Sequence, residues 1–236
     1  YIDVEDNLDL NSAFTLSTWI KREAGSTNSS IISKRDLSYT QGFDLKINAL
    51  GRIEMSWING ITRIIASTVA IPEDVWHHIA VTHDGTTARL YIDGVLETTE
   101  TLPLPADTSQ SFLIAAAGRD GSTTAHFDGN IDEVRVWNTA LNQDQLRFLM
   151  NQELEDNPGT IGKYFDDNSI LPTKNDASSL DFSNLRAYFP MSRYTYTNTN
   201  DDSGNDLVGY LRQLRTVDFQ TAPLPYVSTQ NGNWTD

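Results

Sequence analysis

The side chains best suited to chemistry in this sequence are carboxylates, because its 236 residues include 32 Asp and Glu but no Cys. A retaining glycosidase needs two carboxyl groups about 5 Å apart, and residues two apart on a strand share a face. The nearest pairs, Asp3 with Glu5 and Asp128 with Asp132, have no further Glu in register, and no Glu-x-Asp-x-x-Glu run occurs. A Gly-x-Ser-x-Gly turn for a nucleophilic serine is missing too. The sequence therefore predicts that the protein is not an enzyme.

Aromatic side chains are the second group that could do chemistry, because sugar rings stack on them while nearby polar groups bind hydroxyls. Trp19 and Tyr91 fall on the polar faces of predicted strands, and Trp57 lies beside the Asn59-Gly60 hairpin turn. We therefore take Trp57, Trp19 and Tyr91 as candidate carbohydrate-binding residues. Ordinary packing in the core remains the alternative for each of them.

The elements that must position these residues are short strands. Apolar and polar residues alternate over 13–21, 42–48 and 52–57, which is the pattern of half-buried strands. The nearly continuous apolar run at 111–117 predicts a central strand. Many short strands separated by turns indicate an all-β sandwich of two antiparallel sheets.

One short helix is predicted, from about Asn142 to Asn151. Asn142 can cap its start, Gln145 occupies the third position of a capping box, and Leu141 and Leu146 occupy the hydrophobic-staple positions. We expect this helix to close one end of the sandwich. Residues 153–180 are rich in Asn, Asp, Pro, Gly and Ser and are interpreted as a connector.

Four sequence blocks carry a family resemblance. The longest runs from Trp76-His77-His78-Ile79-Ala80 to Leu90-Tyr91-Ile92-Asp93-Gly94-Val95, and the others are 14–21, 32–34 and 127–137. The sequences of these blocks and their order resemble LamG-like jelly rolls of the concanavalin A-like lectin/glucanase superfamily, over about residues 1–152. The resemblance implies an antiparallel jelly-roll sandwich with one concave sheet, on a scaffold that hosts both lectins and glycoside hydrolases.

The C-terminal extension, residues 181–236, holds further predicted strands. Its run Ala187-Tyr188-Phe189-Pro190-Met191 resembles opening strands that the family normally places before the strand at residue 1. The extension could therefore complete the same sandwich or begin a neighbouring module. The tail at 220–228 resembles those of large secreted surface adhesins of gliding, Bacteroidetes-type bacteria that use type IX secretion.

The resemblance also implies metal ligands. In the superfamily, an Asp that opens the last strand often helps hold a structural calcium ion, and Asp132 stands at that position. Calcium takes six to eight oxygen ligands, and an acidic chain without Cys suits calcium better than zinc. Asp3, Asp201 and Asn205 are further candidates, because they lie in segments that resemble the family. Asp132 could instead simply accept hydrogen bonds from turn amides.

Composition limits the partners. The formal net charge is −15 and the pI is about 4.5, which disfavours nucleic acid and anionic membranes. No apolar run approaches the length of a membrane span, and both ends suggest a piece of a longer multidomain chain. The predicted function is a secreted bacterial cell-surface module for adhesion, binding an extracellular polysaccharide or surface glycan with structural calcium. An architectural spacer is the alternative, and a glycoside hydrolase is less favoured.

Overall fold

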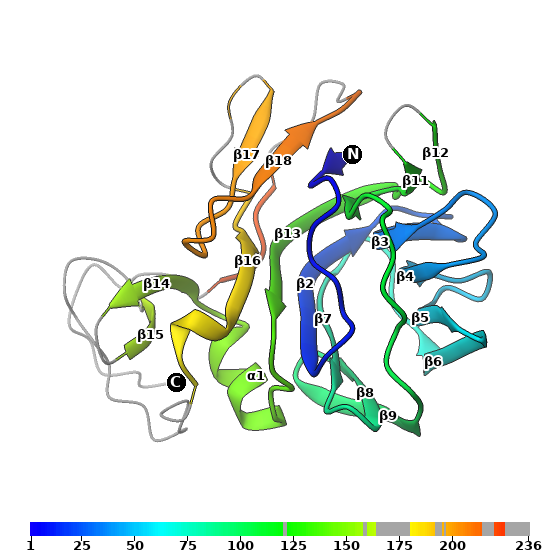
Figure 1. Ribbon diagram of the computed structural model, residues 1–236. Coiled ribbons are helices and arrows are strands. Elements are labelled where there is room, and N and C mark those ends of the chain that lie inside the picture. The colour runs from blue at the N-terminus through cyan, green and yellow to red at the C-terminus, as the bar shows by residue number, and fades with distance from the viewer. Residues whose placement is uncertain are drawn as a thin grey trace.

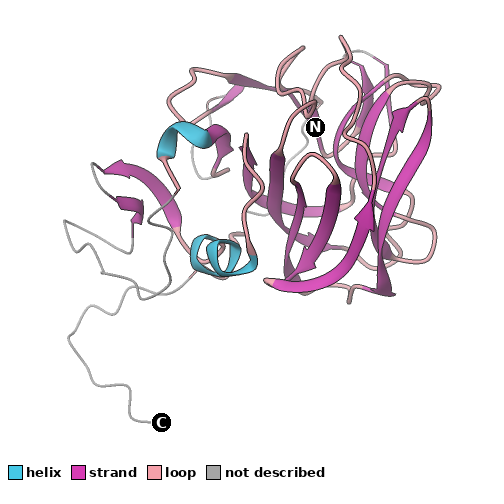
Figure 2. Ribbon diagram, turned by 60° about the horizontal axis from the view of Figure 1, so that its bottom comes forward, coloured by secondary structure: helices cyan, strands magenta, loops and turns pink. Residues whose placement is uncertain are grey.

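The computed structural model describes residues 1–119, 122–157, 160–163, 180–191, 195, 197–213 and 220–224. Two antiparallel sheets form a sandwich, with one α-helix outside it (Figures 1 and 2). The fold class predicted from the sequence, a jelly-roll sandwich with one short helix and further C-terminal strands, is confirmed.

The first sheet has six strands in the order β16-β13-β2-β7-β8-β9. Its strands in chain order are β2 (Phe14–Arg22), β7 (Trp76–His83), β8 (Thr87–Ile92), β9 (Val95–Thr101), β13 (Gly129–Trp137) and β16 (Leu185–Phe189). The strand predicted at 13–21 is thus β2, at the middle of the sheet. β16 comes from the C-terminal extension and pairs with β13 at the sheet edge.

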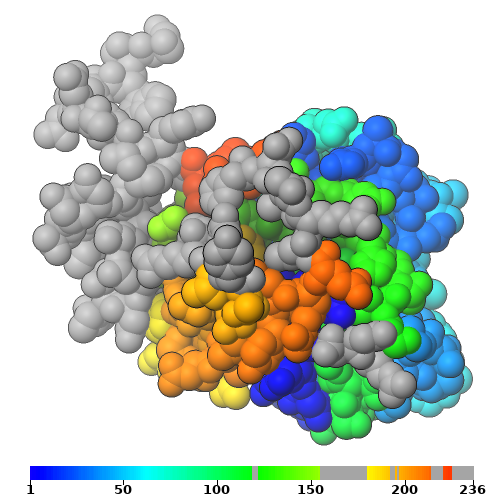
Figure 3. Space-filling model, turned by 90° about the horizontal axis from the view of Figure 1, so that it is seen from above, coloured from blue at the N-terminus to red at the C-terminus, as the bar shows by residue number. Residues whose placement is uncertain are grey.

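The second sheet has ten strands, of which eight follow the order β17-β18-β1-β10-β3-β4-β5-β6. They are β1 (Ile2–Asp3), β3 (Ser29–Arg35), β4 (Gly42–Ile47), β5 (Arg52–Asn59), β6 (Ile61–Ala70), β10 (Leu113–Ile114), β11 (Ala117–Arg119), β12 (Ser122–Thr124), β17 (Asn198–Asn200) and β18 (Val208–Leu211). β18 pairs with β1. The C-terminal extension therefore supplies strands to both sheets, and Figure 3 shows its part of the second sheet (orange) beside the N-terminal strand (dark blue).

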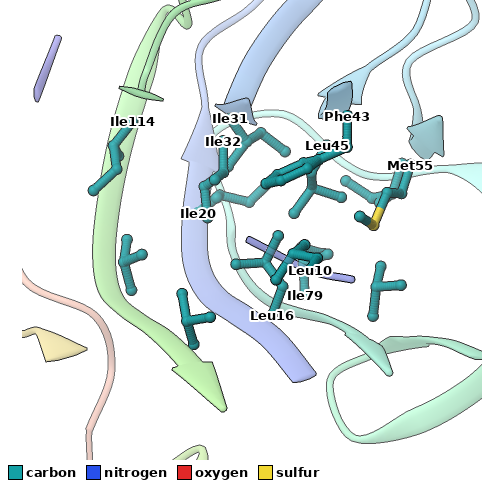
Figure 4. Close-up of a cluster of buried hydrophobic side chains, with 14 of the residues drawn as sticks. Leu10, Leu16, Ile20, Ile31, Ile32, Phe43, Leu45, Met55, Ile79 and Ile114 are labelled. Atoms are coloured by element: carbon teal, nitrogen blue, oxygen red, sulfur yellow. The ribbon is translucent and has the colours of Figure 1, made fainter. Parts of the chain in front are cut away.

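The core lies between the sheets and consists of the alternate, apolar side chains of each strand, which point inward. Leu16, Ile20, Leu45, Met55 and Ile79 are all fully buried there (Figure 4). Burying one such side chain contributes about 1.5–3 kcal/mol. The alternation read from the sequence therefore identifies which face of these strands turns inward.

The helix α1 (Gln143–Leu149) follows β13 and begins as the sequence predicts. The Asn142 side chain accepts from the Gln145 amide and the Gln145 side chain accepts from the Asn142 amide, which completes the capping box. Leu146 and Leu149 pack on the outer face of the six-stranded sheet. The helix therefore covers that face.

Two stretches differ from simple expectation. The run at 111–117 forms only the two-residue β10 and the start of β11, because Ala115 between them takes a positive φ of 68°. The predicted connector at 153–180 contains a two-stranded sheet, β14 (Glu153–Asn157) and β15 (Thr160–Lys163), and ends near η1 (Phe182–Asn184). Its residues 164–179 lie outside the described part of the chain.

Candidate functional site

The outer face of the six-stranded sheet holds two of the three predicted sugar-binding residues, but neither is open to solvent. Trp19 is 6% exposed, and its indole Nε1 donates to the carbonyl of Met150 at 2.7 Å. Tyr91 is 4% exposed and belongs to the cluster beneath α1. Both lie on the outward parity, as predicted, but α1 and the chain after it cover the rings. A covered ring offers no platform to a sugar.

Trp57, the third candidate, lies inside the sandwich. It shares strand parity with Ile53 and Met55, is fully buried, and donates its indole N–H to the carbonyl of Pro103 at 2.9 Å. Trp57 therefore packs in the core, which is the alternative that the sequence left open for it. The physical reason is that side chains alternate regularly along β5, so Trp57 points inward together with Ile53 and Met55.

Asp132 is buried at a bulge of β13. Its Oδ1 accepts from the amide of Glu133 at 3.0 Å and its Oδ2 from the amide of Ala222 at 2.7 Å. This arrangement matches the alternative in which Asp132 accepts hydrogen bonds from backbone amides. It also fastens the chain at residue 222 against the six-stranded sheet.

The other candidate ligands lie in two different places. Asp201 accepts from the amide of Tyr188 at 2.7 Å and from the Ser203 hydroxyl at 2.7 Å, and Asn205 donates to that same hydroxyl at 2.9 Å. Asp3 lies on β1 and accepts from the amide of Glu5. Within the described part of the chain, no three His, Asp or Glu side chains gather as a metal site would require. Structural calcium therefore stays a prediction from the sequence.

Asp132 leads to a prediction about pH. Burial raises the pKa of its carboxyl to about 6, whereas an Asp in the unfolded chain titrates near about 4. The folded state thus keeps a proton that the unfolded state loses, so the free energy of unfolding falls as pH rises through that window. Between about pH 4 and 6.5, wild type should lose about 2 kcal/mol more than Asp132→Asn. Urea unfolding at each pH measures this, and parallel profiles would contradict it.

The outer face of the ten-stranded sheet carries a row of aligned side chains. Its members are opposite one another in the strand registers and extend from β18 to β6: Tyr210, Asp3, Leu113, Ser33, Asp44, Ser56 and Ile64. Hydrogen-bonding side chains occupy five of these seven positions, and Ile64 at the β6 edge is 49% exposed. No α-helix packs on this row among the described residues. Asp3, Leu113, Ser33, Asp44 and Ser56 are buried, so the accessible part of the row lies at its two ends.

A cluster of four residues forms around the β3–β4 loop at this row, and we call it the Tyr39 cluster: Arg35, Tyr39, Asp44 and Ser56. Arg35 Nε donates to Asp44 Oδ2 at 2.9 Å, and the guanidinium carbon lies 4.8 Å from the centre of the Tyr39 ring. The Tyr39 hydroxyl donates to Ser56 Oγ at 2.8 Å. One aromatic ring, one cation, one carboxylate and one hydroxyl are thus held together.

The loop that carries Tyr39 is fixed by its own hydrogen bonds. Asp36 accepts from the Thr40 hydroxyl at 2.8 Å and from the amides of Thr40 at 2.7 Å and Gln41 at 3.1 Å. Burial raises the pKa of Asp36, but these hydrogen bonds, that of the Thr40 hydroxyl first, outweigh it and hold the pKa below its usual value. A side chain at Gly42 would meet the carbonyl of Lys34 at 1.8 Å, so only glycine fits there. The loop therefore presents Tyr39 in a preorganised position.

The charges of this face are balanced in pairs. Burial raises the pKa of Asp44, while Arg35 beside it lowers it. Lys46 and Glu54 form a second pair at 3.0 Å near the rim of the cluster, with side chains 26% and 15% exposed. Arg35, Asp44 and Ser56 are buried whereas Tyr39 is half-buried, so Tyr39 is the part of the cluster that a ligand can reach.

Sequence reasoning did not single out the Tyr39 cluster. Its four members come from β3, β4, β5 and one loop, so their proximity depends on strand registers. The usable signal was the polar loop between two predicted strands, with an aromatic residue three positions before Gly42.

Comparison with solved structures supports the fold. A protein presumed to bind carbohydrate, from Bacteroides ovatus, superposes with a TM-score of 0.62 at 18% identity, over 89% of this chain and 54% of that one. Domain 4 of AbnA, a GH43 arabinanase of Geobacillus stearothermophilus in complex with arabinotriose, gives 0.51 at 21% identity, covering 62% and 68%. The CBM40 domain of the Ruminococcus gnavus IT-sialidase, bound to α2,3 sialyllactose, gives 0.51 at 18%, covering 59% and 83%. The chain thus spans about half of the first of these proteins.

Sequence comparison identifies the family. No curated protein matches the sequence significantly. In the described residues, no helix is long and apolar enough to cross a membrane. The family model of the concanavalin A-like lectin/glucanases superfamily matches residues 1–147, which is more than half of the chain and includes all the strands of the family resemblance. The two-sheet jelly roll and this match together show that the chain belongs to the concanavalin A-like lectin/glucanases superfamily.

Proposed function

We propose that this protein is a non-catalytic carbohydrate-binding module and that its glycan binds at the Tyr39 cluster. The observation that carries the proposal is the half-buried Tyr39 side chain, on a face that no α-helix covers among the described residues. Its ring centre lies 4.8 Å from the Arg35 guanidinium carbon, and its hydroxyl donates to Ser56 Oγ at 2.8 Å. Sugars present CH groups to aromatic rings and hydroxyls to neighbouring polar groups. Tyr39 would supply the aromatic surface, while Arg35, Asp44 and Ser56 behind it are buried and hold it in place.

Structures of the same fold support the glycan as ligand. Two of the three superposed proteins hold an oligosaccharide, arabinotriose in one and sialyllactose in the other. One of the two is domain 4 of an arabinanase, and the other is the CBM40 of a sialidase. A binding domain without catalysis is therefore compatible with this scaffold.

The charges of the site argue against hydrolysis. A glycosidase keeps two carboxyl groups facing the scissile bond, whereas Asp44 is paired with Arg35 and Glu54 with Lys46. Each of these carboxylates therefore faces a cation and not a second carboxyl group across an open cleft. We therefore assign these groups to ligand binding and to the stability of the face.

We further propose that the module serves adhesion at a bacterial surface, within a longer secreted chain, with calcium as structural support. Calcium is tested by thermal unfolding: a rise in Tm on adding calcium that Asp132→Asn abolishes would support it, and an unchanged Tm would remove it.

The architectural alternative, a spacer, is favoured by one observation, the burial of Trp19, Trp57 and Tyr91. Substitution of Tyr39 distinguishes the two functions, because only the glycan-binding function needs its ring.

Replacing Tyr39 with alanine should weaken glycan binding at least about tenfold, or about 1.4 kcal/mol, because the stacking platform is removed. The matched control is Tyr210→Ala, since Tyr210 also carries a guanidinium, that of Arg212, at 5.1 Å on the same sheet. Isothermal titration with the best ligand from a glycan array measures both. Equal affinities of Tyr39→Ala and wild type would refute the site.

A further inference from the structure

A pocket of about 580 Å³ lies at the side of the sandwich, away from the Tyr39 cluster. Three separate stretches line it: residues 6–14 between β1 and β2, the end of β13 at 136–138, and Arg186, Asn205 and Leu207 of the C-terminal extension. Figure 1 shows the first stretch (dark blue) descending from β1 to β2. We call this cavity the seam pocket, because the family-matched part and the extension meet there.

The wall formed by residues 6–14 is held by a buried cation. The ammonium of Lys34, whose side chain is fully buried, lies 2.9 Å from Asp6 and 2.5 Å from Asp9. Asn7 adds a bond from its side-chain nitrogen to the carbonyl of Val4 at 2.7 Å. The opposite wall is held by Asn205, which donates to the carbonyl of Leu185 at 2.9 Å. Both walls are therefore fixed before any ligand arrives.

Several polar groups of the lining are left for a ligand. Asn11, Ser12 and Arg186 are exposed, and their side chains have no hydrogen-bond or ion-pair partner among the described residues. They come from both walls, two from the β1–β2 connection and one from β16. Leu8 and Leu207 add half-buried apolar surface to the same lining.

The charge of the lining selects the class of ligand. Asp6 and Asp9 are paired with the ammonium of Lys34 behind them, Asp9 also contacts Asp107, and Arg186 brings a guanidinium to the opposite wall. A site whose carboxylates are already paired with a cation, and which combines amide, hydroxyl and guanidinium donors with apolar patches, suits a neutral polyhydroxylated molecule. Its volume also falls within the range of about 300–1,000 Å³ that is usual for ligand pockets.

We propose that the seam pocket is a second saccharide site, which takes a neutral monosaccharide or the end of a neutral oligosaccharide. Asn11, Ser12 and Arg186 would bind its hydroxyls, and Leu8 and Leu207 would contact its CH groups. The site goes beyond the Tyr39 cluster, shares no residue with it, and needs the C-terminal extension to exist.

The test is a titration of the whole chain with glucose, galactose, mannose and arabinose in turn, followed by ¹H–¹⁵N NMR. We expect at least one sugar to give saturable shifts of amides lining the pocket. Ser12→Trp, which fills the cavity, and Arg186→Ala, which removes the guanidinium, should each weaken that binding at least about tenfold. Thr27→Trp adds the same ring at an exposed loop position outside the pocket and should leave it unchanged.

Three results would overturn the proposal. They are the absence of saturable shifts with all four sugars, binding that persists in both Ser12→Trp and Arg186→Ala, and shifts that only an anionic sugar, glucuronate, produces. The pocket is monitored by its own amides, so these results do not depend on whether a glycan binds at the Tyr39 cluster.

Discussion

Replacing Arg135 with methionine lowers the free energy of unfolding by about 3–5 kcal/mol in our expectation, because it leaves a buried carboxylate without its cation. The Arg135 side chain is 2% exposed and donates to the Glu133 carboxylate and to the carbonyls of Leu149, at 2.6 Å, and Gln152. The Tyr188 hydroxyl donates to the same carboxylate at 2.9 Å. Arg135 therefore joins β13, the chain after α1, and the C-terminal β16.

The neighbours of Arg135 cannot replace it. His78 is fully buried beside it, and burial, with Arg135 adding to it, lowers the His78 pKa to about 3, so this imidazole stays neutral. The matched control is the double variant Glu133→Gln with Arg135→Met, which removes both charges and should recover a large part of the loss. Urea unfolding at neutral pH measures all three proteins. A loss below about 1 kcal/mol in Arg135→Met would show that the pair contributes little.

Shortening the chain to residues 1–152 should abolish cooperative folding. This removes β16, β17 and β18, and with them the fully buried side chains of Leu185, Tyr188 and Phe189. At about 1.5–3 kcal/mol for each large side chain, the loss approaches the whole stability of about 5–15 kcal/mol that is usual for a domain. It also uncovers the edges of β13 and β1, where unpaired strands invite aggregation.

The control for this truncation is a chain that ends at residue 224 and keeps all strands that the structure describes. It should unfold in one cooperative transition at nearly the temperature of the full chain. Circular dichroism on heating and size-exclusion chromatography measure both proteins. A soluble, cooperatively unfolding chain of residues 1–152 would show that the sandwich does not need the strands of the extension.

Local signals in the sequence were enough for much of the fold. The capping box of α1 needs only Asn142 and Gln145, three residues apart, and the Asn59-Gly60 turn forms between β5 and β6 as predicted. Parity also put Leu16 and Ile20 on the inner face of β2. These features depend on neighbours along the chain, which is why a single sequence reveals them.

The candidate site depended on contacts that the sequence does not show. Alternation alone places Asp132 and Arg135, three residues apart, on opposite faces of β13, but a bulge between them, with Glu133 at a φ of 55°, pairs Asp132 with Trp19 and Arg135 with Ser17, so both lie on the outer face. Parity placed Trp19 outward correctly and could not reveal that the chain at Met150 would cover it. The Tyr39 cluster required the registers of three strands.

A glycan array on the purified chain, with calcium and again with EDTA, tests glycan binding at the Tyr39 cluster most directly, and it is read beside Tyr39→Ala and Tyr210→Ala. We predict a selective set of glycans bound by wild type and by Tyr210→Ala, and lost in Tyr39→Ala. Loss of the signal in EDTA would indicate that glycan binding depends on a metal ion. An array without selective binding in either condition would contradict glycan binding at the Tyr39 cluster and leave the architectural role.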